Sequence, residues 1–332
     1  GIATFYSQLP HAFLFYSFYR NRDKKCFSSY FFTRDNRSKI LKILVFLLPE
    51  ISQVMKPVNY NSLNKNGAAL VMYIDMNSYF ASCEQQLQKH LRNKPIGVCP
   101  YSGPNAVVIA ASKEAKKFGV KTGMYASQCK ALCPDFEMVP TRPFLYRRIH
   151  VQIMNILRSY CDADSVIPKS IDEAVVDLTN YTYIYKDPIA LARQIKKDIH
   201  NTVGAYITCS IGIAANVFLA KLATEIQKPD GLIQITPENI DHYLAQLSLT
   251  DIPGIARAGE KRLNRAGIYT PIDFRNASES LLRKVFGGVT GNYWYYRLHF
   301  KEVDLSTTDY KRMSAMRSLS AQTRSGYETL QA

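Results

Sequence analysis

The sequence predicts an α/β fold, and two observations carry this prediction. From Ala68 onward, short apolar runs alternate with longer segments in which apolar side chains recur at helical spacing. Such alternation is typical of a sheet that is covered by helices. Hydrophobic residues make up 47% of the 332 residues, which is enough for a sizeable core and for two or three domains.

The predicted elements follow one another in chain order. Residues 68–74 (AALVMYI) form an apolar strand that ends on Asp75, and a helix follows over 78–91. Two further strands, IGVCP and AVVIAAS, flank a Ser-Gly-Pro-Asn turn and lead into the helix KEAKKFG. The remaining predicted elements are a helix over 146–161, a strand within 169–178, a helix over 188–202, the strand AYITCSIGIA and a helix over 216–227.

Residues 1–66 differ from the rest because Phe and Tyr crowd them, with Arg and Lys in between. Their longest apolar stretch, 43–49, is too short to span a bilayer, which takes about 20 residues. No small-residue cleavage site follows this stretch, as a signal peptide would require. The sequence therefore assigns no function to this extension and predicts neither a membrane-spanning segment nor a membrane partner for it.

The charge balance indicates the kind of partner. Lys and Arg number 42 against 27 Asp and Glu, which gives a formal net charge of +15. This excess favours a polyanion, either nucleic acid or an anionic membrane surface. The seven cysteines are scattered, and Cys129 and Cys133 have no second Cys or His pair at zinc-ligand spacing. Reduced thiols, and with them a cytoplasmic location, are therefore expected.

Three acidic residues indicate the chemistry. Asp75 ends the first apolar strand, whereas Asp172 and Glu173 are adjacent within an apolar run, where two like charges repel each other. A divalent cation would neutralise such a pair. If the two strands are neighbours in one sheet, three carboxylates converge at its edge and can hold two cations for phosphoryl transfer. The spacing alone leaves an exposed turn open as the alternative.

Three blocks of the sequence resemble the Y-family translesion DNA polymerases. They are YIDMNSYFASCEQ (73–85), KSIDEAVVDLT (169–179) and CSIGIAANVFLAKLATEIQKPDG (209–231), and they occur in the family's order and at its separations. The resemblance extends from about Ala68 to about Leu305. DMNSYFASCE and EAKKFGVKTGM are similar to the bacterial polymerase V catalytic subunit, whereas KPDG is similar to the polymerase IV branch.

The resemblance implies a catalytic centre with two Mg²⁺ ions, for which Mn²⁺ can substitute. Asp75 and Asp172 would bridge both ions. Glu173 would complete the ion that activates the primer 3′-hydroxyl, and the Met76 carbonyl would join the nucleotide-bound ion. The metals would then compensate the adjacent carboxylates while the hydroxyl attacks the α-phosphate of a dNTP.

Further residues are assigned to the nucleotide by the same resemblance. Phe80 falls at the position of the steric gate, an aromatic ring that excludes a ribonucleotide 2′-hydroxyl; taken without the family, it is an ordinary core phenylalanine. Lys228 matches a lysine that reaches the triphosphate as a point charge. Lys113 and Lys116 stand where many members have Tyr and Arg, so Lys116 can neutralise phosphate but cannot make a bidentate contact.

Residues 249–274 predict a helix-hairpin-helix. Pro253 and Gly254 would form its tight turn, and the amides at the start of the following helix can bind a DNA phosphate without reading bases. Four basic residues after the turn favour the DNA backbone as the partner: Arg257, Lys261, Arg262 and Arg265. Sequence-independent binding that weakens with salt is therefore expected.

The implied fold is an α+β palm with small fingers and a helical thumb. The family's little-finger domain, an additional DNA-gripping module, is expected to be essentially absent. We expect a basic, aromatic-rich extension without assigned function at 1–66, the palm at 67–78 and 145–235, the fingers at 79–144, the thumb at 236–303 and a truncated linker at 304–332.

The implied function is template-directed, low-fidelity DNA synthesis past lesions, in DNA repair and the SOS response. Primer-template DNA and dNTPs are the expected partners, in the cytoplasm at the nucleoid. A sliding clamp and other replication or SOS proteins are further candidate partners. One alternative is a non-catalytic DNA-binding protein on the same fold, which the retention of Asp75, Asp172 and Glu173 disfavours. A palm-like nucleotide cyclase is another, but it would not explain the helix-hairpin-helix.

Overall fold

The structure, a computed structural model, describes residues 18–21, 24–27 and 69–305. The chain divides into two compact units, Gly1–Pro57 and Val58–Ala332. In the first unit, strands β1 (Phe18–Asn21) and β2 (Lys24–Phe27) pair antiparallel. The rest of the predicted extension, and the predicted linker after residue 305, lie outside the described residues.

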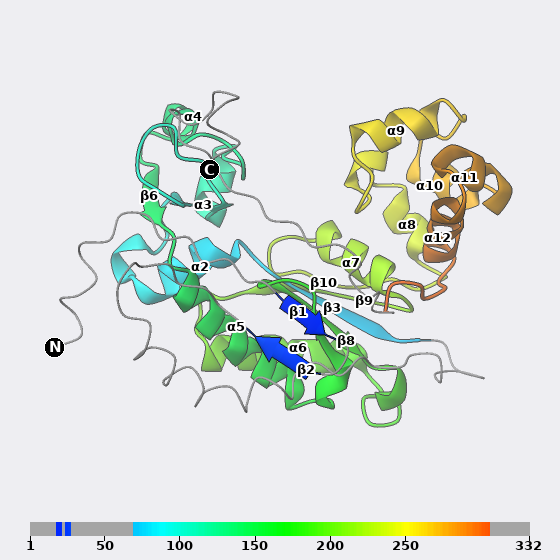
Figure 1. The fold of residues 1–332 in the computed structure, drawn as a ribbon, viewed down its shortest axis with the longest axis horizontal. Coiled ribbons are helices and arrows are strands. Elements are labelled where there is room, and N and C mark those ends of the chain that lie inside the picture. Colours follow the sequence, from blue (N-terminus) through cyan, green and yellow to red (C-terminus); the bar gives the residue numbers. More distant parts are fainter. Residues whose placement is uncertain (1–17, 22–23, 28–68, 306–332) are drawn as a thin grey trace. The chain divides into compact units, whose positions relative to one another are not determined.

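A five-stranded sheet forms the centre of the second unit (Figure 1). Its strand order is β10-β9-β3-β8-β7, and both neighbours of the central strand β3 run antiparallel to it. β7 is antiparallel to β8, whereas β10 is parallel to β9. The strands are β3 (Val71–Met76), β7 (Val166–Pro168), β8 (Glu173–Asp177), β9 (Cys209–Ala214) and β10 (Leu232–Gln234).

Four helices accompany this sheet, and Figure 1 shows α5 and α6 on one face with α7 on the other. α5 and α6 begin with proline, whose missing N–H costs nothing in the first turn. The helices are α2 (Tyr79–Leu87), α5 (Pro143–Arg158), α6 (Pro188–Thr202) and α7 (Val217–Ile226). Single 3₁₀ turns lie at Lys89–Leu91, Ala163–Ser165 and Thr179–Tyr181.

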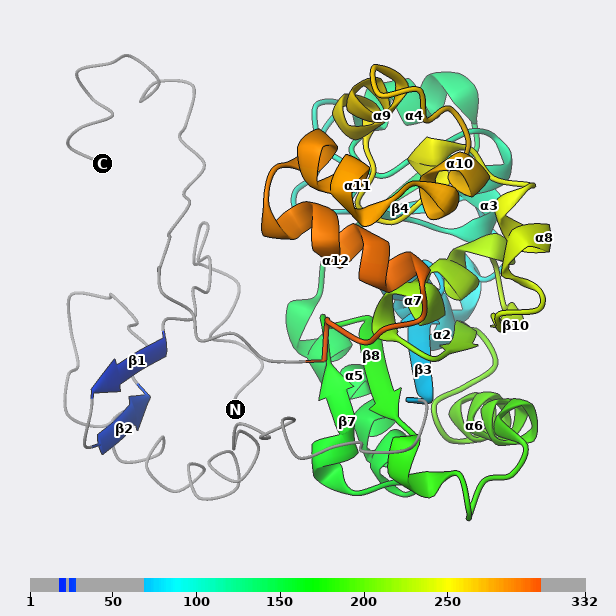
Figure 2. The same cartoon turned by 90° about the vertical axis from the view of Figure 1, so that its right-hand side faces the viewer.

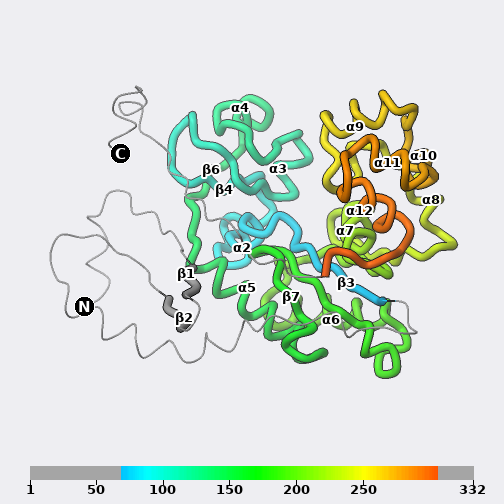
Figure 3. Tube along the Cα trace, turned by 45° about the vertical axis from the view of Figure 1, so that its right-hand side comes forward, coloured from blue at the N-terminus to red at the C-terminus, as the bar shows by residue number. Residues whose placement is uncertain are grey.

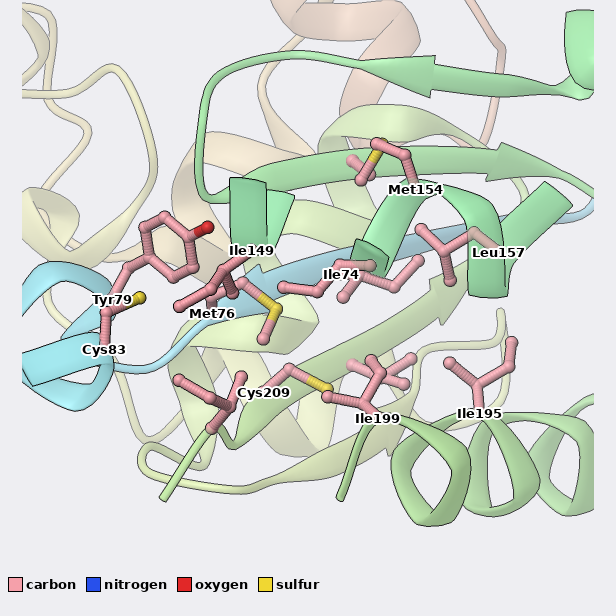
Figure 4. Close-up of a cluster of buried hydrophobic side chains, with 14 of the residues drawn as sticks. Ile74, Met76, Tyr79, Cys83, Ile149, Met154, Leu157, Ile195, Ile199 and Cys209 are labelled. Carbon is pink, nitrogen blue, oxygen red and sulfur yellow. The ribbon is translucent and has the colours of Figure 1, made fainter. Parts of the chain in front are cut away.

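The alternation of side chains along β3 separates two cores. Ile74 and Met76 pack with residues of α5 and α6, as Figure 4 shows for Ile149 and Ile199. Tyr73 belongs instead to the core that includes α7. The mixed α/β class predicted from the sequence is therefore confirmed, with helices on both faces of the sheet.

A small second sheet lies in the chain between α2 and α5, with strand order β5-β4-β6 and its own buried core. Its elements are β4 (Ile96–Cys99), β5 (Ala110–Ala111), β6 (Glu137–Pro140), α3 (Lys113–Lys117) and α4 (Ala126–Leu132). The predicted strand AVVIAAS was expected to be longer than β5. It is short because the Val108 amide bonds to the Met124 carbonyl, outside the sheet.

Five helices follow the central sheet, and Figure 3 traces this part of the chain. They are α8 (Ile240–Leu244), α9 (Arg257–Asn264), α10 (Pro271–Asn276), α11 (Glu279–Phe286) and α12 (Val289–Leu298). The first helix of the predicted helix-hairpin-helix is only a 3₁₀ turn, Leu249–Asp251. Figure 2 shows α12 beside α11, and Trp294 of α12 is buried against Phe274 and Phe286.

Two further findings concern the part of the chain that the structure describes. Within it, no helix combines the length and the apolar character needed to cross a bilayer. The six cysteines between residues 69 and 305 are buried free thiols. The division into palm, fingers, thumb and linker remains a prediction.

The contact between β9 and α7 generates a first prediction. A Cβ atom on Gly212 would lie 2.0 Å from the Ala220 carbonyl oxygen, whereas one on Gly259 would lie no closer than 3.4 Å to Ile255. We expect Gly212→Ala to lower the free energy of unfolding by about 1–3 kcal/mol because the backbone must shift. Gly259→Ala, in α9, should be neutral or raise it by up to about 1 kcal/mol. Urea unfolding checks this, and equal effects of the two substitutions would contradict it.

Candidate active site at the edge of the central sheet

Asp75 and Glu173 are direct cross-strand partners on β3 and β8. Both belong to the face of the sheet that packs on α7, and Asp75 is 7% exposed. Side chains in such pairs stand about 5 Å apart at Cβ, so two carboxylates there repel each other unless a cation joins them. The strands that the sequence suggested as neighbours therefore are neighbours, and they bring these two carboxylates together.

A lysine ammonium supplies the positive charge between them. Lys221 of α7 donates hydrogen bonds to Asp75 Oδ2 and, at 2.7 Å, to Glu173 Oε1. It also lies 2.9 Å from Glu225 Oε1. Burial alone would lower the pKa of Lys221, but the Asp75, Glu173 and Glu225 carboxylates outweigh it and hold the pKa above its ordinary value.

Asp172 does not join this pair. It precedes β8, and its carboxylate accepts a 2.6 Å hydrogen bond from the Ser170 hydroxyl. Its backbone remains close to the site, since the Asp172 carbonyl accepts a 2.9 Å bond from the Met76 amide. Among residues 69–305, no three acidic, His or Cys side chains are arranged as a metal-binding group as they stand. The structure thus brings together two of the three predicted carboxylates and places the third beside them.

His150 supports the segment before Asp172, a role that the sequence did not indicate. Burial lowers the pKa of His150. Its Nδ1–H donates a 2.9 Å hydrogen bond to the Ile171 carbonyl. His150 also lines a small cavity together with Met76 and Asp172. From the sequence, a histidine on an amphipathic helix is indistinguishable from an ordinary polar residue. Only the fold brings His150 next to the segment that precedes Asp172.

The donor set suits a divalent cation. Carboxylate and carbonyl oxygens are the ligands that Mg²⁺ and Mn²⁺ prefer, and Asp75, Glu173 and the Met76 backbone lie together where β3 and β8 meet. Asp75 and Glu173 already share one positive charge, that of Lys221. The residues present therefore fit a metal site, provided that Asp172 turns from Ser170 toward it.

Two of the predicted nucleotide-binding residues, Lys228 and Lys116, bring positive charge close to Asp75. Lys228 lies 3.0 Å from Asp75 Oδ2 and 2.9 Å from Glu225 Oε1. Lys116 of α3 is exposed as a whole, but the desolvation of its ammonium and the neighbouring charge of Lys228 lower its pKa. Lys113 points elsewhere, with its ammonium 5.8 Å from the Tyr206 ring centroid.

Asn77 ties the loop that carries Lys228 to the end of β3. Its side-chain oxygen accepts a 2.8 Å bond from the Asp230 amide, and its side-chain nitrogen donates to Ser210 Oγ at 3.0 Å. Ser210 in turn accepts from the Gly231 amide at 3.3 Å. The buried side chains of Asn77 and Ser210 therefore hold the loop in place, in addition to the ion pair between Lys228 and Asp75.

Phe80 lies on α2, which follows β3, the strand that carries Asp75. Its ring stacks on Tyr146 of α5, with centroids 4.5 Å apart and planes 19° apart. Tyr79 beside it is 3% exposed, and its hydroxyl donates to the Tyr146 carbonyl at 2.6 Å. Phe80 is partly exposed whereas Tyr79 is a core residue, as expected if Phe80 and not Tyr79 faces a ligand.

An ion pair between buried Glu84 and half-exposed Arg142 holds Tyr146 in place. Glu84, fully buried on α2, accepts a 3.0 Å hydrogen bond from Arg142 Nε and a second one from the same guanidinium. It also accepts from the Tyr146 hydroxyl at 2.7 Å and from Gln88 at 2.8 Å. Arg142 lies between β6 and α5, so this network ties α2, which carries Phe80, to the start of α5.

The predicted DNA-binding residues lie together on the helical part of the chain. Gly254 has φ +90°, the left-handed conformation that a tight turn requires and that favours glycine. Four basic residues of α9 and its end are exposed: Arg257, Lys261, Arg262 and Arg265. Gly254 and Trp294 also line an open cavity of about 410 Å³ with Lys221 and Arg297.

Comparison with known proteins identifies the family. The model of the impB/mucB/samB family matches residues 74–225. The chain is 32% identical over 224 residues to a DNA polymerase IV of Vibrio vulnificus and 37% identical over 217 residues to one of Staphylococcus aureus. These alignments cover 68% and 65% of this chain, and 62% and 60% of the respective relatives.

Solved structures agree with this assignment. The "Y-family DNA polymerase chimera Dbh-Dpo4(243-245)-Dbh" is similar with a TM-score of 0.64 and 31% identity, over 73% of this chain and 70% of that one. The "Insertion ternary complex of Dbh DNA polymerase" is similar with a TM-score of 0.62 and 33% identity, over 70% and 67%. The chain belongs to the Y-family DNA polymerases, and it spans less than two thirds of the length of the curated relatives named above.

The ion pair of Glu84 with Arg142 generates a second prediction. Arg142→Ala should destabilise the chain by about 1–3 kcal/mol, because it leaves the buried Glu84 carboxylate without its cation. Adding Glu84→Gln to this variant removes the uncompensated charge and should restore much of the loss. Urea unfolding of the single and double variants measures the difference. Equal stability of the two would contradict the assignment.

Proposed function

We propose that this chain is a template-directed DNA polymerase of the translesion type, which adds dNTPs to a primer 3′-hydroxyl by two-metal phosphoryl transfer. One observation carries the proposal: the cross-strand pairing of Asp75 with Glu173, with the Asp172 backbone bonded to Met76 beside them. Membership of the family supports it, since its relatives are named as DNA polymerases.

In this proposal, Asp75, Asp172, Glu173 and the Met76 carbonyl hold two Mg²⁺ ions, and Mn²⁺ can replace them. When bound, the ions supply charge compensation for the nucleophile and the leaving group. The protein's part is to place the carboxylates, which it does by strand register and by the bond from Met76 to Asp172. His150 holds the loop that precedes Asp172.

The incoming nucleotide lies against three further residues in this proposal. Lys228 and Lys116 neutralise its triphosphate, which the position of Lys228 beside the acidic pair supports. Phe80 packs against the sugar, and its stacking on Tyr146 keeps the ring from yielding to a 2′-hydroxyl.

Primer-template DNA is the proposed macromolecular partner. The turn at Gly254 and the exposed Arg257, Lys261, Arg262 and Arg265 would contact phosphates and not base edges. Such binding does not depend on sequence and weakens with salt. A sliding clamp, other replication or SOS proteins and a location at the nucleoid remain predictions.

Primer extension with Mg²⁺ tests the proposed function. Asp172→Ala and Glu173→Ala should each lower extension by two to four orders of magnitude, because metal charge compensation is worth about several kcal/mol. Asp164→Ala, an exposed acid on a 3₁₀ turn, is the matched control and should extend normally. If the chain binds primer-template but neither it nor the control extends the primer, a non-catalytic DNA-binding role replaces the proposal.

Sugar selection tests the role of Phe80 separately. Phe80→Ala should lower the ratio of dNTP to rNTP incorporation efficiency by at least about tenfold, since loss of the ring leaves space for the 2′-hydroxyl. Phe80→Tyr keeps the ring and should keep the ratio within a few-fold. If Phe80→Ala leaves the ratio of dNTP to rNTP incorporation efficiency unchanged, Phe80 only packs in the fold and does not select the sugar.

A further inference from the structure

The Lys221 ammonium lies between the two carboxylates of the proposed metal site. Its ammonium contacts Asp75, Glu173 and Glu225, and it lies 5.2 Å from the ring centroid of Tyr73. The side chain is 21% exposed, so these ion pairs are only partly screened by solvent. The contacts come from α7, an element that carries no predicted metal ligand.

The ammonium and a divalent cation require the same oxygens. Asp75 Oδ2 accepts from both Lys221 and Lys228, and Glu173 Oε1 accepts from Lys221. A metal held by these two carboxylates would lie within a few ångströms of the ammonium, where two positive charges repel strongly. The two cations therefore cannot both occupy the site.

An open cavity beside Lys221 gives its ammonium space to move away from the two carboxylates. It lines the open cavity of about 410 Å³ that Tyr73, Lys169, Trp294 and Arg297 also border. A lysine side chain has four rotatable bonds, so its ammonium can swing into this cavity without movement of α7. The carboxylates would stay in place, because the register of β3 and β8 fixes their backbones.

We infer that Lys221 is the resident counter-ion of the metal site: its ammonium holds Asp75 and Glu173 together before metal arrives, and metal binds in exchange for it. This inference rests on the proposed function, because it takes Asp75 and Glu173 as the metal ligands. It adds that metal affinity in the absence of DNA is set by a competition between two cations. Lys221 is a positioning residue of the free chain, not a ligand.

Mn²⁺ binding to the DNA-free chain, followed by the electron paramagnetic resonance signal of free Mn²⁺, tests the inference. Lys221→Met keeps the apolar stem but removes the competing charge, so it should bind Mn²⁺ about three- to tenfold more tightly than the wild type. In EDTA the same variant should melt at a lower temperature, because Glu173 loses its cation and Asp75 retains only Lys228. Lys221→Arg retains a cation and should stay near the wild-type affinity.

Lys197→Met is the matched control, since Lys197 is an exposed lysine of α6, and it should match the wild type in both measurements. Equal or weaker Mn²⁺ binding by Lys221→Met would overturn the inference while leaving the proposed function standing. Failure of the wild type itself to bind Mn²⁺ would overturn both.

Amine labelling of the wild type gives a second readout that needs no variant. Acetic anhydride should modify Lys221 several-fold faster in saturating Mg²⁺ than in EDTA, with Lys197 as the internal reference, because metal frees the ammonium from its carboxylates. Unchanged labelling of Lys221 in a chain that binds Mg²⁺ would mean that lysine and metal do not exchange, and would overturn the inference.

Discussion

The repulsion between Asp75 and Glu173 is the constraint on which the rest of the site depends. Strand register places both carboxylates on one face of the sheet, and the pairing of β3 with β8 fixes the backbones that carry them. Two lysines offset the repulsion: Lys221 of α7 and Lys228 of the following loop both form ion pairs with Asp75. Asn77 and Ser210 then fix that loop to the same strands. Apolar side chains of α7 pack on the same face of the sheet, and the two lysines add the charge that this packing cannot supply.

A second constraint connects this site to the small sheet. Phe80 and Glu84 lie four residues apart on α2, so they share one face of the helix. Both contact Tyr146, one through its ring and the other through its hydroxyl. Because Arg142 completes the network where the small sheet joins α5, the position of the Phe80 ring depends on a buried charge that is remote from the acidic pair.

Strongly periodic elements could be predicted from the sequence. The helix predicted over 188–202 has those bounds, because Asp187 caps it and Pro188 begins it. The helix predicted over 146–161 instead spans Pro143–Arg158, because Pro143 is favoured at the first helical position and begins the helix earlier. The first helix of the predicted hairpin is only a 3₁₀ turn, because the chain from Leu249 turns at once into the Gly254 bend.

The site was predictable to the extent that backbone pairing decides it. The convergence of Asp75 and Glu173 follows from two apolar strands that pair in register. Side-chain orientation does not follow: Asp172 accepts from Ser170, two residues before it, which no spacing rule indicates. The role of Lys221 could not be predicted, because a lysine in an apolar helix is usually a solvated surface charge. Only the tertiary contacts show that its ammonium pairs with Asp75 and Glu173.

Anomalous diffraction from crystals grown with primer-template, a non-reactive dNTP analogue and Mn²⁺ would locate the metal. We expect Mn²⁺ within about 2.0–2.3 Å of carboxylate oxygens of Asp75 and Glu173. We also expect Asp172 to be turned toward the metal and the Lys221 ammonium to be displaced from the pair. If Mn²⁺ binds elsewhere while Lys221 still joins Asp75 to Glu173, these carboxylates are not the metal ligands.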